Sequence, residues 1–332
     1  MSIIRDTIYI GTDIGSVSIK VGLITHQDHS SVLKQIQLAH TDLFEPIYTM
    51  KIYDGTPIAI LVSKYYRIKG EPLRAALHLL QPIIQQLPEI FKIALAATGN
   101  GGKIISQTFE VPYENEFQAI ARGVSILYPK VHTVLEIGGD SSKYILLDKN
   151  PNSGVSGILD YEVNGDCAAG TGSFIDQQAS RLLYNIEEVG DIVIQAGKAA
   201  NIAGRCSVFA KSDMIHAQQK GYQPPEILKG LCQAVVRNFK GTIIKGKDII
   251  PPVAFIGGLA ANKGIVAALK DVLKFNDDSL LVPDFYAWME AIGAAFIVSD
   301  LATTTPVLVF RQKLSKVTHT HQKFETLPPL QK

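Results

Sequence analysis

Two segments of the chain share one pattern, in which a β-rich run enters a glycine turn and a second β-rich run leaves it. They are TIYIGTDIGSVSIKVGLI at 7–24 and TVLEIGGDSSKYILLD at 133–148. A β-hairpin is the simplest structure for each. Each places an acidic residue near its turn and a lysine shortly after it: Asp13 with Lys20, and Glu136 with Lys143. The repetition predicts a chain built from two related halves.

Strand and helix patterns alternate along the rest of the chain, with glycine turns at the junctions. The segments IFKIALAATGNGG and PVAFIGGLA each favour a strand that ends in a glycine turn. Apolar residues at three- and four-residue spacings indicate helices in the stretches that lie between the strands. These helical segments are 71–87, 115–129, 173–186, 208–221, 226–243, 262–273 and 288–300. The alternation favours an α/β class.

Length and charge narrow the class of protein. A chain of 332 residues exceeds what one compact core usually spans, which favours two lobes. Lys plus Arg (32) nearly balance Asp plus Glu (31), and this argues against a nucleic-acid-binding protein, which needs a concentrated basic surface. The longest apolar runs, near 251–260 and 291–298, fall well below the roughly 20 residues of a membrane-spanning helix. The N-terminus lacks a signal-peptide pattern, so we expect a soluble, cytoplasmic protein without membrane partners.

The first glycine turn, GTDIGS, has the groups that a nucleotide triphosphate requires. Phosphates need backbone N–H donors and a glycine that allows close approach, and Mg²⁺ or its waters need a carboxylate. The loop supplies two glycines, two hydroxyls and one carboxylate: Gly11, Gly15, Thr12, Ser16 and Asp13. Gly, Asp and Ser are also ordinary turn residues, so one such loop is weak evidence.

Two further glycine turns strengthen the prediction of a nucleotide site. The second loop, EIGGDSS, repeats the arrangement, and the third, FIGGLAANKG, follows a buried strand and opens a helix that could border the adenosine. The chain has neither a P-loop nor a dinucleotide fingerprint. The phosphates would therefore bind between two hairpins that face each other across a cleft. The candidate residues of these two loops are Gly138, Gly139, Asp140, Ser141 and Ser142, then Gly257, Gly258 and Asn262.

The order of IGTDIGS, LEIGGDSSK and FIGGLAANKG resembles the phosphate-1, phosphate-2 and adenosine motifs of the actin, sugar-kinase and Hsp70 superfamily. NGDCAAGTGSFIDQQA at 164–179 and GRCSVFAKSDMIHAQQKG at 204–221 are similar to signature segments of the activators of 2-hydroxyacyl-CoA dehydratases. These activators are grouped with the ATPase subunits of benzoyl-CoA reductase in the BadF/BadG/BcrA/BcrD-type ATPase family. The match spans residues 7 to about 298, includes ATGNGG, and is closest to one unit of the long fused activases.

Of the three cysteines, two lie where a thiolate is favoured. Cys167 and Cys206 each precede a predicted helix, and Cys206 also follows Arg205. Two thiolates supply half the ligands of a [4Fe–4S] cluster, although two unrelated buried cysteines or a zinc site shared between subunits remain alternatives. The resemblance implies one cluster bridging a homodimer, or bridging this unit and a fused second activator unit. Cys232 lies in an apolar helical pattern and is interpreted as a small buried hydrophobe.

The resemblance also implies a function. Two actin-like, ribonuclease H-like lobes would bind ATP or ADP, and hydrolysis would accompany delivery of a low-potential electron from the cluster. A reduced ferredoxin or flavodoxin would be the donor, and a 2-hydroxyacyl-CoA dehydratase-like protein the acceptor. Asp13 would organise Mg²⁺ and its waters, Glu136 would orient the attacking water, and Lys20 would offset phosphate charge. Where the compact activators have glutamine followed by aspartate, this chain reads GGDSSK, so Asp140 adds negative charge near the phosphates.

Three other readings remain at this point. A sugar or small-metabolite kinase shares both hairpins and would need a carboxylate base, for which Asp166 or Asp213 are candidates. The second alternative is a nucleotide-gated interaction module that has lost the cluster. The third is an actin-like filament protein.

The resemblance and the patterns together place the domain boundaries. We expect a first lobe at 1–130, a second lobe at 131–285, a closing helix at 286–304 that packs back on the first lobe, and a linker-like tail at 305–332. The tail is polar and punctuated by proline, and it lacks a sustained period.

Overall fold

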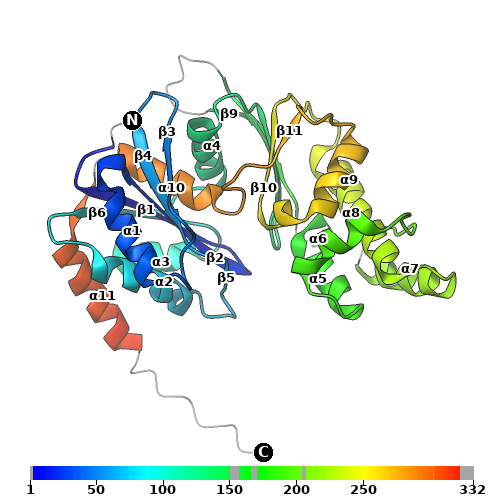
Figure 1. Ribbon diagram of the computed structural model, residues 1–332, viewed down its shortest axis with the longest axis horizontal. Coiled ribbons are helices and arrows are strands. Elements are labelled where there is room, and N and C mark those ends of the chain that lie inside the picture. Colours follow the sequence, from blue (N-terminus) through cyan, green and yellow to red (C-terminus); the bar gives the residue numbers. More distant parts are fainter. Residues whose placement is uncertain (1–2, 150–156, 166–169, 204–206, 302, 322–332) are drawn as a thin grey trace, which may run out of the picture. The chain divides into compact units, whose positions relative to one another are not determined.

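The computed structural model describes residues 3–149, 157–165, 170–203, 207–301 and 303–321 (Figure 1). The chain divides into two compact units. Unit 1 comprises residues 1–127 and 290–332, and unit 2 comprises residues 128–289. Each unit contains its own β-sheet and its own hydrophobic core.

Within the described residues, unit 1 contains a seven-stranded sheet in the order β12-β6-β1-β2-β4-β3, with β5 paired to β2. Strand β1 is antiparallel to β2 and parallel to β6. The strands are β1 (Thr7–Ile14), β2 (Ser18–His26), β3 (Tyr48–Lys51), β4 (Pro57–Val62), β5 (Tyr66–Arg67), β6 (Lys92–Thr98) and β12 (Thr305–Pro306).

The main core of unit 1 lies between this sheet and four helices, α1, α2, α3 and α11. It receives Ile8, Ile10 and Ile14 of β1, whose alternate residues point to the opposite face of the sheet. The helices of the unit are α1 (Ser30–Ala39), which the short η1 (Gln27–His29) precedes, α2 (Pro72–Gln86), α3 (Gly102–Phe109), α4 (Glu116–Leu127), α10 (Met289–Asp300) and α11 (Val307–His321).

On the opposite face of β1, helix α10 lies close to the backbone. A Cβ atom on Gly11 would stand 1.8 Å from the carbonyl oxygen of Ala291. One on Gly293 would stand 1.7 Å from the carbonyl oxygen of Ala119 in α4. No side chain fits at either distance, so these glycines set how closely α10 packs on β1 and α4.

Unit 2 contains a five-stranded sheet among its described residues, in the order β11-β10-β7-β8-β9. Its core packs α5, α6, α8 and α9 against β7, β8 and β10. The elements are β7 (Thr133–Ile137), β8 (Ser142–Leu147), β9 (Ile158–Val163), α5 (Gly172–Arg181), α6 (Ile186–Gln195), α7 (Ser207–Gln219), α8 (Pro224–Phe239), η4 (Lys240–Ile244), β10 (Val253–Ile256), η5 (Gly258–Ala261), α9 (Lys263–Leu273) and β11 (Leu280–Leu281).

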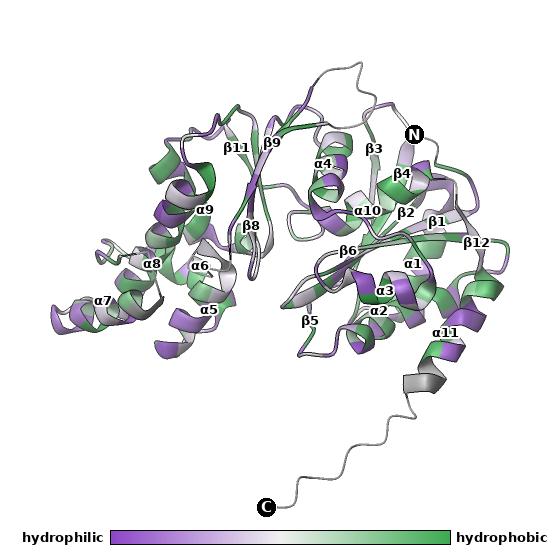
Figure 2. Cartoon of the chain, turned by 180° about the vertical axis from the view of Figure 1, so that it is seen from behind, coloured by the Kyte–Doolittle hydropathy of each residue, from purple (hydrophilic) through white to green (hydrophobic). Residues whose placement is uncertain are grey.

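The predicted α/β class and both predicted hairpins are confirmed, as β1–β2 and β7–β8. Cys232 is fully buried in α8, as predicted for a small core residue. The prediction of a linker-like tail is wrong over 307–321, which forms α11. Val307, Phe310 and Leu314 recur at helical spacing and pack into the core, although the helix also carries many polar residues (Figure 2). None of the helices in the described part of the chain has the length and apolar character to cross a membrane.

Candidate functional site

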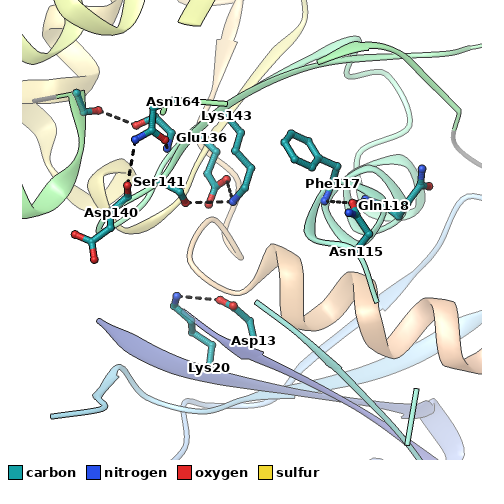
Figure 3. A network of polar contacts seen from close by, with 12 residues as sticks. Asp13, Lys20, Asn115, Phe117, Gln118, Glu136, Asp140, Ser141, Lys143 and Asn164 are labelled. Carbon is teal, nitrogen blue, oxygen red and sulfur yellow. Dashed lines mark hydrogen bonds and ion pairs between the residues drawn. The ribbon is translucent and has the colours of Figure 1, made fainter. Parts of the chain in front are cut away.

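The β1–β2 hairpin pairs an acid with a lysine directly across its two strands. Asp13 stands opposite Lys20 in the ladder, and Lys20 Nζ lies 2.9 Å from Asp13 Oδ2 (Figure 3). The side chain of Asp13 is 4% exposed and that of Lys20 is 16% exposed. Directly opposite residues on one face of a sheet are close enough for such a pair, so the strand register itself creates it.

Asp13 is an unusual carboxylate because it is buried and has a second acid beside it. Burial is the main cause that raises its pKa to about 7; the nearby Glu290 raises it further, whereas Lys20 lowers it. The other oxygen, Oδ1, is buried without a hydrogen-bond partner among the described residues. Glu290 lies in the first turn of α10 and was missed in the sequence, where an acid at a helix start is ordinary.

The ATGNGG turn after β6 lies directly against the end of β1. Gly99 has φ +84°, and a Cβ atom there would stand 2.6 Å from Asp13 Oδ1. The N–H of Gly101 donates to the carbonyl of Ile14 at 2.8 Å. The hydroxyl of Tyr113 donates to the carbonyl of Gly99 at 3.3 Å. The glycines of this turn therefore allow it to approach the buried carboxylate.

The other candidate residues of the first loop differ in how exposed they are. Gly15 closes the turn by donating its N–H to the carbonyl of Ser18 at 3.1 Å, and Ser16 is exposed at the tip. Thr12 is fully buried, and its hydroxyl donates to the carbonyl of Ala96 at 3.4 Å. The exposed tip is open to a phosphate, whereas the Thr12 hydroxyl is engaged inside the sheet.

The β7–β8 hairpin repeats the acid–lysine pair at the same register. Glu136 stands opposite Lys143, and Lys143 Nζ lies 2.7 Å from Glu136 Oε2 (Figure 3). Lys143 Nζ also donates to Ser141 Oγ at 3.3 Å. The turn is closed by the N–H of Gly138, which donates to the carbonyl of Ser141 at 2.8 Å. The lysine of this pair is buried more deeply than Lys20, at 2% exposed, whereas Glu136, at 8%, is slightly more exposed than Asp13.

Hydrogen bonds join the β7–β8 turn to the chain that precedes Cys167. Asn164 Oδ1 accepts the N–H of Ser142 at 2.7 Å, and Asn164 Nδ2 donates to the carbonyl of Asp140 at 3.2 Å (Figure 3). The N–H of Asn164 also donates to the carbonyl of Ser142 at 3.1 Å. Asn164 therefore fixes the tip of the turn and the start of β8 to the chain that leaves β9.

The chain that follows Cys167 is joined to the same turn. The N–H groups of Gly172 and Ser173, at the start of α5, donate to the carbonyls of Gly138 and Gly139, both at 2.8 Å. Ser142 Oγ donates to the carbonyl of Gly170 at 2.7 Å. Ser173 Oγ donates to Asp140 Oδ1 at 2.5 Å. The loop predicted to bind phosphate is thus connected to both flanks of 166–169.

The third glycine turn follows β10. Gly257 has φ +89°, and a Cβ atom there would stand 2.5 Å from the carbonyl oxygen of Ile137. Gly258 is exposed, and nothing lies within 4 Å of the position its Cβ would take. Asn262 is buried and caps α9, because its Oδ1 accepts the N–H groups of Gly264 and Ile265. Gly258 is therefore open to a ligand, whereas Asn262 Oδ1 is engaged in capping α9 and Asn262 Nδ2 is buried without a hydrogen-bond partner among the described residues.

Cys167 and Cys206 lie outside the described residues. The chain before Cys206 is anchored, because the N–H of Ala203 donates to Asp213 Oδ2 at 2.7 Å and Arg237 Nη2 donates to the carbonyl of Ile202 at 2.9 Å. Among the residues that the structure describes, no group of three or more His, Cys, Asp or Glu side chains is arranged to hold a metal. Burial raises the pKa of Cys232 to about 12, so it is not a suitable thiolate ligand.

Comparisons with known proteins identify a family for the chain. The family model described as the BadF/BadG/BcrA/BcrD ATPase family matches residues 10–297. The 2-hydroxyisocaproyl-CoA dehydratase activator of Clostridioides difficile is 30% identical over 188 residues, which cover 57% of this chain and 67% of the activator. The activator of lactoyl-CoA dehydratase of Anaerotignum propionicum is 32% identical over 191 residues, covering 57% and 69%.

A solved structure extends the likeness to the fold. The activator of the 2-hydroxyisocaproyl-CoA dehydratase from Clostridium difficile with bound ADPNP matches with a TM-score of 0.66 and 22% identity. The match covers 97% of this chain and 99% of that one. The expected actin-like α/β fold with two lobes is confirmed.

Proposed function

The chain belongs to the BadF/BadG/BcrA/BcrD ATPase family, and we propose that it is an ATP-dependent activator of a 2-hydroxyacyl-CoA dehydratase or a related CoA-ester reductase. In this role it hydrolyses ATP and delivers a low-potential electron to its acceptor. Two relatives named as dehydratase activators support the acceptor class. A structural neighbour with bound ADPNP supports the nucleotide.

The observation that carries the proposal is the repeated acid–lysine pair at the turns of two hairpins, Asp13 with Lys20 and Glu136 with Lys143. In ATP hydrolysis, one carboxylate holds Mg²⁺ or its waters and another orients the attacking water. Asp13 suits the cation, because its Oδ1 is buried without a hydrogen-bond partner. Glu136 suits the water, because Lys143 and Ser141 hold its position. Lys20 offsets phosphate charge.

Electron delivery rests on Cys167 and Cys206. With a partner unit, either a second copy or a fused activator unit, they provide the four thiolates that a [4Fe–4S] cluster needs. Such a cluster would supply one-electron transfer, and the donor would be reduced ferredoxin or flavodoxin in the cytoplasm. The hydrogen bonds of Asn164, Gly172 and Ser173 to the β7–β8 turn give a physical route by which the bound nucleotide acts on the flanks of Cys167.

The test is iron and sulfide analysis of protein purified without oxygen, together with ATP turnover. We expect a brown protein with about four irons per two units, from which Cys167→Ser or Cys206→Ser removes the iron. Cys232→Ser is the matched control and keeps the iron, because that thiol is buried in α8. Iron-free wild-type protein, or ATP turnover that Asp13→Asn leaves unchanged, would contradict the proposal.

Activation of an acceptor is a separate measurement. Wild-type protein with ATP and a chemical reductant should activate a purified 2-hydroxyacyl-CoA dehydratase, whereas ADP should not replace ATP. A kinase of the same superfamily is the alternative. Asp213, one of its two candidate bases, accepts the N–H of Ala203 and anchors the chain before α7. Asp166, the other, lies outside the described residues. ATP-dependent phosphorylation of a sugar by colourless protein would favour the kinase.

A further inference from the structure

A pocket of about 670 Å³ opens on unit 2 beside the C-terminal half of α8 (Figure 1). Pockets that bind small molecules commonly have volumes of roughly 300–1,000 Å³. Three segments line this one: the chain at 201–203, helix α8 and the turn η4. The lining residues include Asn201, Ile202, Arg237, Asn238, Gly241 and Thr242. None of the lining residues belongs to the three glycine turns assigned to the nucleotide.

The polar side chains of the pocket carry hydrogen-bond donors that the fold leaves unused. Arg237 has five N–H donors. With other described residues its side chain makes one hydrogen bond, from Nη2 to the carbonyl of Ile202 at 2.9 Å. The side-chain amides of Asn201 and Asn238 are not hydrogen-bonded within the described part of the chain. A guanidinium fork with amide donors near it matches the oxygens of a carboxylate or a phosphate.

The charge of the lining favours an anion. Arg237 is exposed, and it is the one ionisable side chain among the lining residues. Asp213 is an acid that contacts the lining, but its Oδ2 is engaged, because it accepts the N–H of Ala203 at 2.7 Å. A cation in the pocket would be repelled by the guanidinium without a carboxylate in the lining to offset it, whereas an anion would be attracted.

The turn η4 leaves space in the wall of the pocket. It is a single π-helical turn, in which the N–H of Lys245 donates to the carbonyl of Lys240 at 3.0 Å. Such turns are rare and are frequent at functional sites. Gly241 lies in this turn, and nothing stands within 4 Å of the position that its Cβ would take. A ligand can therefore approach the backbone of η4 closely.

The pocket also touches the chain next to both cysteine segments. The lining at 201–203 directly precedes 204–206. On the other side, a Cβ on Gly170, the residue that follows 166–169, would stand 3.4 Å from Asn238 Nδ2. A ligand held by Arg237 and Asn238 would therefore contact groups that adjoin both segments.

We propose that this pocket binds a small organic anion through its carboxylate or phosphate group, with Arg237, Asn238 and Asn201 as the donors. The site is separate from the nucleotide loops and does not depend on the proposed function. Because bound anion would order the chain at 201–203 and beside Gly170, it gives the protein a means of responding to such a molecule at the flanks of its cysteines.

The experiment is a calorimetric titration of full-length protein with succinate in one series and glycerol 2-phosphate in the other, with ADP present throughout. We expect saturable binding of one anion per chain, and the series with the higher affinity identifies the charged group. Arg237→Gln should weaken binding at least about tenfold, because hydrogen bonds from a charged donor are lost. Gly241→Leu should also weaken it at least about tenfold, because its side chain occupies open space in the pocket. Amide exchange at 201–203 should become slower when the anion binds.

Arg181→Gln and Gly197→Leu are the matched controls. Arg181 is an exposed arginine in the last turn of α5, and Gly197, like Gly241, has nothing within 4 Å of its Cβ position. Neither residue lines the pocket, so both variants should bind the anion as the wild type does. Circular dichroism confirms that each variant is folded. The inference is overturned if neither anion binds saturably, or if folded Arg237→Gln and Gly241→Leu proteins bind with wild-type affinity.

Discussion

The two hairpins place their acid and lysine at the same register and differ two residues earlier. In unit 1, that position pairs Gly11 with Gly22 across the strands. In unit 2, the corresponding pair is Val134 with Ile145, both fully buried. The glycines admit α10, whose first turn adds Glu290 to Asp13. The β1–β2 ladder thus lacks two side chains that the β7–β8 ladder has. Their absence allows α10 to bring a second acid to Asp13.

The turns differ as well. Each turn is closed by one hydrogen bond of its own, but the glycine turn at 98–102 packs against the end of β1. The β7–β8 turn is joined by hydrogen bonds to Asn164 on one side and to Gly172 and Ser173 on the other. The first hairpin is therefore suited to hold a cation, and the second to pass a change at the phosphates to the chain around 166–169.

The largest expected effect on stability comes from replacing Gly11 of the first hairpin by valine, the residue at the corresponding position of the second hairpin. Gly11→Val puts a Cβ where the carbonyl oxygen of Ala291 stands 1.8 Å away, so α10 must move or unit 1 must unfold. We expect a loss of more than about 4 kcal/mol in the free energy of unfolding. The reverse change, Val134→Gly, should cost less, about 2–4 kcal/mol, for a lost buried side chain. Urea unfolding measures both, and equal losses would remove the distinction.

The two ion pairs should respond differently to loss of the lysine. Lys143→Met leaves Glu136 buried without its cation, which should cost about 3–5 kcal/mol. Lys20→Met should cost about 1–2 kcal/mol, because Lys20 is more exposed and Asp13, with a pKa near 7, can accept a proton. Urea unfolding at neutral pH tests the order. The double variant Glu136→Gln and Lys143→Met should recover most of the stability that Lys143→Met loses. If it does not, the loss does not come from the unpaired charge of Glu136.

The sequence predicted both hairpins because glycine, β-branched residues and alternation act locally. It could not predict that Glu290 meets Asp13, because that contact joins the two ends of unit 1 and depends on how α10 packs on Gly11. The prediction for the tail failed for a related reason. Val307, Phe310 and Leu314 are few apolar positions in a polar segment, and the core that buries them comes from distant helices. Asn262 is a different case, because an asparagine just before a helix is a local N-cap signal, and we assigned this residue to the adenosine instead.

The connection of the second turn to its flanks can be weakened at Asn164. Asn164→Ala removes the acceptor of the Ser142 N–H and a donor to Asp140, with an expected local cost of about 1–3 kcal/mol. Amide hydrogen exchange should become faster at Ser142 and across 170–173. Asn185→Ala is the control, because Asn185 caps α6 in the same unit and should leave exchange at the turn unchanged. Similar exchange in both variants would contradict the connection.

The smallest expected effect concerns the negative charge of Asp140, a residue of the second turn. Asp140 is exposed, and its Oδ1 accepts a hydrogen bond from Ser173, which an asparagine can also accept. Asp140→Asn should therefore keep the turn and tighten ATP binding about two- to fivefold, because one negative charge near the phosphates is removed. Calorimetry with ATP should show this gain at low salt and its loss at high salt, since exposed charges are screened. Asp160→Asn, in the same unit but paired with Lys247, is the control. Weaker ATP binding by Asp140→Asn would show instead that Asp140 helps to hold a cation, so that both hairpins would bind metal.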